Sequence, residues 1–100
     1  MHKAISVTVI GAGLMGHGIG QVFARAGHEV VITDPNATVL NMALERVEAN
    51  LVSEGVDVNR VLCNMRVDGT LQSAVAQADL VIEAAPEKLE LKQKLFADVA

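Results

Sequence analysis

Three glycines at fixed spacing, Gly11, Gly13 and Gly16, are the residues whose arrangement most directly implies chemistry. A Gly-x-Gly-x-x-Gly turn between a strand and a helix binds the pyrophosphate of a dinucleotide. The first glycine allows the tight turn, the second lets the phosphates approach the backbone, and the third lets the helix pack closely on the sheet. The free amides and the helix dipole favour the phosphate charge. We therefore predict dinucleotide binding at 11–16.

An acidic residue follows where this pattern requires one. Asp34 lies about 20 residues beyond the glycine turn, at the end of a second strand-like segment. Its carboxylate can accept hydrogen bonds from the adenosine ribose and repels a 2′-phosphate, and Pro35 and Asn36 follow it without an arginine. We predict NAD as the cofactor, bound at least about tenfold more tightly than NADP. Enzymes that use FAD share this half of the pattern, so a flavin is an alternative.

Hydrophobic periodicity predicts the elements that position these residues. A β-rich run ends at Gly11, and a helical pattern begins at Leu14 with Met15, Ile19 and Val22 on its apolar face. His17 falls on the opposite face, where we expect it to be solvated, and Gly18 and Gly20 are expected to pack against the sheet. Strands are predicted at 5–10, 29–33, 64–68 and 79–84, and helices at 14–26, 37–54, 70–77 and 86–100, with 57–63 ambiguous.

Alternation of strands and helices predicts an α/β fold. We expect a Rossmann-type parallel sheet in the order 3-2-1-4, with helices on both faces and the cofactor crevice between the carboxyl ends of the first and fourth strands. A full fold of this type has a fifth and a sixth strand, so we expect a domain truncated after about four strands. The fourth strand would then be an uncovered edge, which predicts that the fragment self-associates as a homo-oligomer or swaps its last helix.

Composition excludes several classes of partner. The 100 residues are 51% hydrophobic, include two Phe with no Trp or Tyr, and carry a net charge of −4 with eight dispersed Lys and Arg. We therefore expect neither a nucleic-acid partner nor a membrane partner. Cys63 is the sole cysteine, which excludes an internal disulfide and a cysteine-based metal site; we expect it to be a small buried hydrophobe. No apolar run could span a bilayer and no signal peptide precedes the first strand, which predicts a cytoplasmic protein.

Two longer blocks of sequence resemble the beginning of the 3-hydroxyacyl-CoA dehydrogenase family. They cover 9–19 and 26–30 with Asp34, and 78–87 with Leu91 and Lys92. The resemblance implies that NAD contacts Met15, Asp34, Ala85, Glu87 and Lys92, together with the backbone of Gly11, Gly13, Leu14 and Gly16. By spacing alone, Met15 is a core residue and Glu87 and Lys92 are ordinary solvated helix charges.

The same resemblance implies the activity. The family oxidises the 3-hydroxyl of a 3-hydroxyacyl-CoA to the 3-ketone in fatty acid metabolism, with a histidine that takes the hydroxyl proton and a glutamate that orients it. No segment here matches those residues, so we assign no catalytic residue and no metal ligand. We expect 1–100 to be an incomplete NAD-binding domain, inactive alone, with the catalytic remainder and a C-terminal helical domain absent.

Two alternatives stay open. The segment 36–68 is short for this family and its basic residues are Arg46, Arg60 and Arg66, which leaves room for an NAD-dependent dehydrogenase of a small 3-hydroxy acid or a carnitine-like alcohol in place of an acyl-CoA. A non-catalytic NAD-binding or redox-sensing module is the alternative of another class. Recovery of a histidine and a glutamate in later elements would distinguish it from an enzyme.

Overall fold

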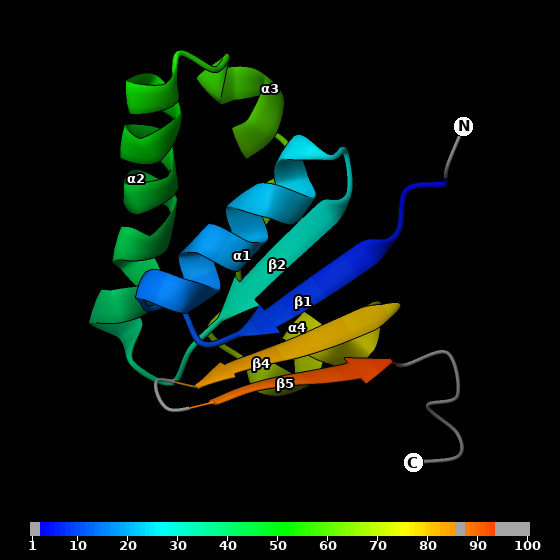
Figure 1. Ribbon diagram of the computed structural model, residues 1–100. Helices are drawn as coiled ribbons and strands as arrows, with labels where there is room; N and C mark the ends of the chain where they lie inside the picture. Colours follow the sequence, from blue (N-terminus) through cyan, green and yellow to red (C-terminus); the bar gives the residue numbers. More distant parts are fainter. Residues whose placement is uncertain (1–2, 86–87, 94–100) are drawn as a thin grey trace.

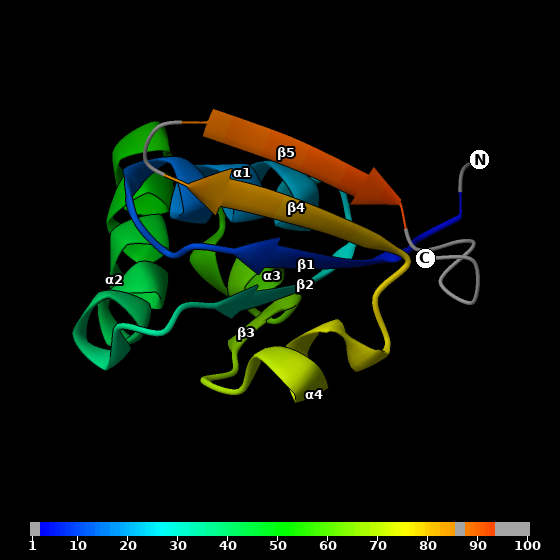
Figure 2. The same ribbon diagram turned by 90° about the horizontal axis from the view of Figure 1, so that it is seen from below.

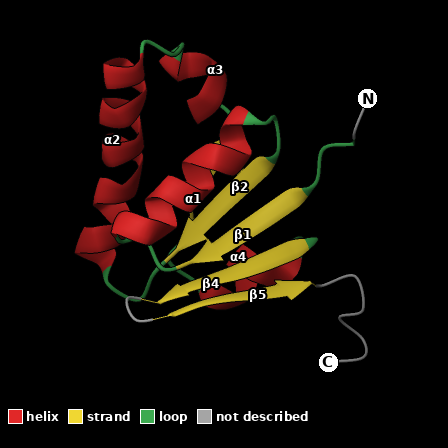
Figure 3. Ribbon diagram, in the orientation of Figure 1, coloured by secondary structure: helices red, strands yellow, loops and turns green. Residues whose placement is uncertain are grey.

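The computed structural model describes residues 3–85 and 88–93. Helices lie on both faces of one sheet (Figures 1 and 3). The strands in chain order are β1 (Ser6–Ile10), β2 (Glu29–Thr33), β3 (Met65–Val67), β4 (Leu80–Ala85) and β5 (Lys88–Gln93). The helices are α1 (Leu14–Arg25), α2 (Ala37–Glu54), α3 (Val58–Leu62) and α4 (Leu71–Ala76).

The sheet has the order β3-β2-β1-β4-β5, and its first four strands are parallel. This confirms the predicted 3-2-1-4 order. Helices α1 and α2 cover one face and α4 lies against the other (Figure 2). At the carboxyl end of the sheet, Ile10 is paired with Thr33 on one side and Glu83 on the other. The segments after β1, β2 and β4 therefore meet at one edge.

The core forms between the sheet and the α1–α2 layer. Strand β1 buries three consecutive residues, Val7, Thr8 and Val9, as a parallel strand covered on both faces must. Helix α2 is N-capped by Asn36, whose side chain accepts a hydrogen bond from the Val39 amide, and C-capped by Gly55, which is left-handed with φ 72°. Both predicted ends of this helix are confirmed, and the buried stripe of the helix is Leu40, Ala43, Val47 and Leu51.

Helix α1 turns only part of its predicted apolar face to the core, where Ile19 packs as predicted. Met15 and Val22 are 48% and 66% exposed, whereas His17 is only 6% exposed. The reason is size: a Cβ built on Gly20 would lie 3.1 Å from the Ile32 side chain, so the small residues Gly16, Gly20 and Ala24 face the sheet at the closest approach. Gly20 therefore packs as expected, whereas a Cβ built on Gly18 meets no atom within 4 Å.

The predicted helix at 86–100 is wrong where the structure describes it. Lys88–Gln93 is β5, antiparallel to β4, with Leu91 opposite Ile82. The sequence Lys-Leu-Glu-Leu-Lys alternates with period 2, as a strand requires, and the edge of β4 has unpaired amides and carbonyls to offer it. The open β4 edge was the reason to expect self-association. Strand β5 covers that edge and is itself the outer strand of the described sheet, so self-association stays a prediction. Residues 86–87 and 94–100 lie outside the described residues.

A pH-dependent contribution to stability is predicted at Asp68, just before α4. Its carboxylate accepts hydrogen bonds from Ser73 Oγ at 2.7 Å and from the Thr70 amide at 2.9 Å. These bonds, aided by Arg66, lower the pKa of Asp68 from its ordinary value. A lowered folded-state pKa stabilises the fold above the unfolded-state pKa, and the stabilisation is lost as the pH falls through the folded-state pKa.

The expected result is that Asp68→Asn lowers the thermal midpoint at neutral pH and that variant and wild type converge in acid. Circular dichroism melts across the acidic range would measure this. A gap between the two midpoints that stays constant with pH would contradict the prediction.

Candidate functional site

The glycine turn joins β1 to α1 in a conformation that its first and third glycines make possible. Gly11 has φ +111°, and a Cβ on it would lie 2.5 Å from the Ala84 carbonyl oxygen. A Cβ on Gly16 would lie 1.6 Å from the Gly11 carbonyl oxygen. Neither position can accept a side chain without movement of backbone, so these two glycines are required by the fold itself. The Ala84 carbonyl oxygen is thus the atom that excludes a side chain at the tight turn. The Gly11 carbonyl oxygen is the atom that excludes one where the helix packs closely.

Gly13 differs from the other two. Its φ is −71°, which any residue can adopt, and a Cβ on it would meet no protein atom within 4 Å. Nothing in the described chain therefore requires a glycine there. The open space beside its backbone is what a pyrophosphate needs for close approach. This observation fits a bound dinucleotide.

The amino end of α1 is an uncapped helix start. Gly13 is the N-cap residue, no side chain accepts from the first amides, and the first turn contains no acidic residue. The first-turn amides of Leu14, Met15 and Gly16 have no acceptor within the helix. Their partial positive charge adds to the helix dipole and favours an anion. Met15 itself, predicted by spacing as core, is exposed beside this helix end.

Asp34 connects the end of β2 to the glycine turn. Its Oδ2 accepts a hydrogen bond from the Ala12 amide at 2.8 Å, and its Oδ1 accepts one from the Asn36 amide at 2.8 Å. A carboxylate offers about four acceptor positions, so positions remain for ribose hydroxyls. Asp34 thus has a structural role, holding the buried Ala12, which the sequence pattern did not indicate.

The structure brings some of the predicted cofactor residues together and separates others. The end of β4 lies beside the turn, because Gly11 packs against the Ala84 backbone and Ala85 is the last residue of that strand. Lys92 lies in β5 opposite Val81, in the part of β4 that precedes the carboxyl edge. Glu87 lies outside the described residues.

A cavity of about 290 Å³ opens near the same edge, on the α4 side. It is lined by Ile10 and Thr33, the last residues of β1 and β2, by Pro35, and by Gly69 and Leu71. The cavity is next to Asp34 in the chain and mostly apolar in its lining. Such a pocket suits a flat apolar group attached to a ribose.

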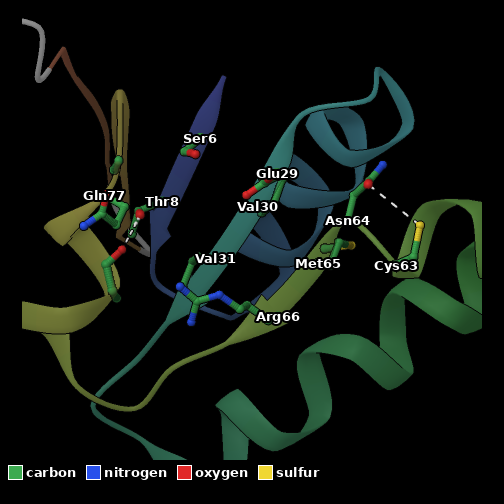
Figure 4. Close-up of a pocket in the computed structure, with 12 residues that line it drawn as sticks. Ser6, Thr8, Glu29, Val30, Val31, Cys63, Asn64, Met65, Arg66 and Gln77 are labelled. Atoms are coloured by element: carbon green, nitrogen blue, oxygen red, sulfur yellow. Dashed lines mark hydrogen bonds between the residues drawn. The ribbon is translucent and has the colours of Figure 1, made fainter. Parts of the chain in front are cut away.

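A second cavity of about 290 Å³ lies at the opposite, amino ends of the strands (Figure 4). Ser6 and Glu29 line it from the starts of β1 and β2, and Thr8 donates to the Ala74 carbonyl across it at 2.6 Å. Sheets of this topology bind ligands at their carboxyl ends, so we do not place the dinucleotide here. Cys63, on the rim, is exposed, which corrects the expectation that it is buried.

The described residues contain neither a membrane-spanning helix nor a cluster of metal-ligating side chains. No helix among them is both long enough and apolar enough to cross a bilayer. Across 3–85 and 88–93, no three His, Cys, Asp or Glu side chains gather where they could share a metal ion.

The residue that sequence reasoning missed is His17. It is buried, its Nδ1 lies 2.9 Å from the Gly13 carbonyl oxygen, and its Nε2 lies 3.3 Å from Asn50 of α2. The signal was its spacing, since residue 17 is four positions after Gly13 and its side chain can return to that carbonyl.

Comparison with known proteins agrees with this geometry. Residues 6–100 match the family described as 3-hydroxyacyl-CoA dehydrogenase, NAD binding domain. The chain is 41% identical over 102 residues to the 3-hydroxyadipyl-CoA dehydrogenase of Escherichia coli, an alignment that covers 95% of the chain and 21% of that protein.

Two solved structures share the fold. The 3-hydroxybutyryl-CoA dehydrogenase from Escherichia coli matches with a TM-score of 0.77 and 35% identity, over 87% of this chain and 20% of that one. A diketoreductase described as acting on dicarbonyl compounds matches with a TM-score of 0.74 and 34% identity, over 88% of this chain and 34% of that one. The chain therefore spans about a third or less of each of these three proteins.

Proposed function

Because the chain belongs to the 3-hydroxyacyl-CoA dehydrogenase family, as its NAD-binding domain, we propose that the intact protein oxidises the 3-hydroxyl group of a 3-hydroxyacyl-CoA to the 3-ketone. This chain supplies the NAD site. The observation that carries the proposal is the convergence of the open Gly13, the Asp34 carboxylate and the end of β4 at one edge. Bound NAD supplies a hydride acceptor.

The described residues bind and orient the cofactor in this proposal. The amides of Leu14, Met15 and Gly16 donate hydrogen bonds to the pyrophosphate. The Asp34 carboxylate accepts hydrogen bonds from the ribose hydroxyls, and the cavity at Thr33 and Pro35 binds the adenine. Ala85, as the last residue of β4, is a proposed contact of the rest of the dinucleotide. Glu87 and Lys92 stay proposed contacts; the position of Lys92 opposite Val81 gives it no support.

We also propose that the proton-transfer residues lie in the remainder of the protein, and that this chain alone binds NAD without turnover. The exposed thiol of Cys63 favours a reducing compartment such as the cytoplasm.

One observation favours a second substrate class. The diketoreductase, an enzyme of dicarbonyl compounds, is nearly as similar to this chain as the 3-hydroxybutyryl-CoA dehydrogenase is. The same NAD domain therefore suits a dehydrogenase of a small 3-hydroxy compound that carries no CoA.

The test is an assay of the intact protein for NADH oxidation with acetoacetyl-CoA, with free acetoacetate and with a small diketone. We expect kcat/KM for the CoA ester to exceed that for the free acid by about tenfold or more, because only the ester can gain binding energy from the CoA group. A preference for the diketone would favour the second class. NAD binding without any turnover would instead indicate a nucleotide-binding module.

A further inference from the structure

A ladder of polar side chains runs along the interface between α1 and α2. His17 and Gln21 of α1 are 6% and 7% exposed, although both are polar. Asn50 Nδ2 of α2 lies 3.3 Å from His17 Nε2 and donates to Gln21 Oε1 at 3.1 Å. The buried polar atoms of the described residues all have partners. The hydrogen bonds of the ladder can therefore be assigned from the donors and acceptors of its members.

The far end of this ladder is anchored at the surface. Gln21 Nε2 faces the carboxylate of Glu54 at 3.4 Å, and Arg25 donates to the same carboxylate at 2.6 Å. The charged groups of the ladder are Arg25 of α1 and Glu54 of α2. The α1 residues recur every fourth position, as do Asn50 and Glu54 of α2, so one stripe of each helix forms the contact.

The position of the hydrogen on the His17 ring follows from the groups that face its two nitrogens. The Gly13 carbonyl only accepts, so the hydrogen of the imidazole must be on Nδ1 of His17. Nε2 is then an acceptor, which matches the Asn50 amide nitrogen that faces it. The second hydrogen of the same amide goes to Gln21. One neutral tautomer of His17 satisfies every contact in the ladder.

The His17 ring contributes to the geometry of the glycine turn through the Gly13 carbonyl. The Gly13 carbonyl oxygen accepts from the His17 backbone amide at 3.0 Å and also from its ring at 2.9 Å. Two donors from one residue fix the direction of that carbonyl. Because the peptide bond is planar and trans, the amide of Leu14, in the same peptide, is fixed in the opposite direction, outward from the helix start.

We propose that His17 is a positioning residue for the dinucleotide: its Nδ1–H bond to Gly13 holds the Leu14 amide aimed at the pyrophosphate. The inference rests on the proposed NAD site at the turn. The ring itself does not touch the cofactor in this proposal. It acts through the peptide that joins Gly13 to Leu14.

Two near-isosteric variants separate this role from helix packing. The amide of Asn reproduces Nδ1 of histidine, so His17→Asn can keep the bond to Gly13 and lose the contact with Asn50. The amide of Gln reproduces Nε2, so His17→Gln can keep the contact with Asn50 and lose the bond to Gly13. We expect the Asn variant to bind NAD within about twofold of wild type and the Gln variant to bind roughly five- to tenfold more weakly, as measured by calorimetry.

Thermal midpoints of both variants serve as the folding control. A purely structural role predicts that NAD affinity follows the midpoint, and not the atom retained. Equal affinities in the two variants, at comparable midpoints, would overturn the inference while leaving NAD binding by wild type intact. Absence of NAD binding by wild type would overturn the proposed site together with the inference.

A second readout needs no ligand. Nitrogen NMR of His17 in the wild-type chain distinguishes a protonated from an unprotonated ring nitrogen. We expect the hydrogen of the neutral ring to be on Nδ1, which faces the Gly13 carbonyl oxygen. The opposite tautomer would remove the bond to Gly13 and refute the proposal.

Discussion

Gly13→Ala is expected to fold and to lose NAD affinity by at least about tenfold, a loss of ~1.4 kcal/mol or more. The added methyl group would meet no protein atom, since nothing lies within 4 Å of its position, and the φ of −71° suits alanine. It would instead occupy the space through which the pyrophosphate reaches the backbone. The fold should lose no more than about 1 kcal/mol, the difference between glycine and alanine at an N-cap. Calorimetric titration with NAD and a thermal melt would measure the two effects.

Two glycines of the same segment provide matched controls. Gly16→Ala places a Cβ 1.6 Å from a backbone oxygen, so we expect it to disrupt the fold as well as binding. Gly18→Ala places its Cβ in open space within α1, so it should bind NAD normally and gain up to about 1 kcal/mol from helix propensity. Normal NAD affinity in Gly13→Ala would contradict the assignment of this space to the cofactor.

The second large effect is expected from Asp34→Ala. The variant removes the negative charge that repels a 2′-phosphate and the acceptor for the ribose hydroxyls. NAD affinity should fall by about tenfold or more, and the preference for NAD over NADP should approach unity. The fold should also lose about 1–3 kcal/mol, because the buried Ala12 amide would lose its acceptor. Parallel titrations with both nucleotides, and a denaturant melt, would measure these changes.

Asp79→Ala is the matched control for this variant. Asp79 also accepts a backbone amide with its carboxylate, that of Ser6 at 2.9 Å, but it lies at the amino end of the sheet. Its loss should affect stability without changing the ratio of NAD to NADP affinity. If Asp34→Ala kept a strong preference for NAD, the discrimination would have to come from another residue.

The strands and their order were predictable because their signals are local. A short β-rich run that ends in glycine indicates a buried parallel strand, and alternation with helices leaves few arrangements for such strands. The predictions failed where a local sequence pattern was compatible with both a helix and a strand. The segment 88–93 contains good helix formers, but its apolar and charged residues also alternate with period 2. It forms a strand because the edge of β4 offers it backbone hydrogen-bond partners.

Part of the core-facing side of α1 was mispredicted for a related reason. Hydrophobicity placed Met15 and Val22 inside, yet both are exposed. The side of α1 toward the sheet is chosen by the smallness of Gly16 and Gly20, which allows the closest approach of backbone to sheet. Size therefore outweighed hydrophobicity at this helix, and the adjacent His17 became buried against α2.

The amino-acid sequence by itself determined the glycine turn, the acidic residue after β2 and the order of the parallel strands, because each depends on residue types at fixed spacing along the chain. Only the tertiary structure decided which glycine leaves space for a ligand, that Asp34 holds the Ala12 amide, and that His17 is buried against Asn50 of α2. Those features depend on segments far apart in the chain coming within a few ångströms of one another. No local pattern records such distances.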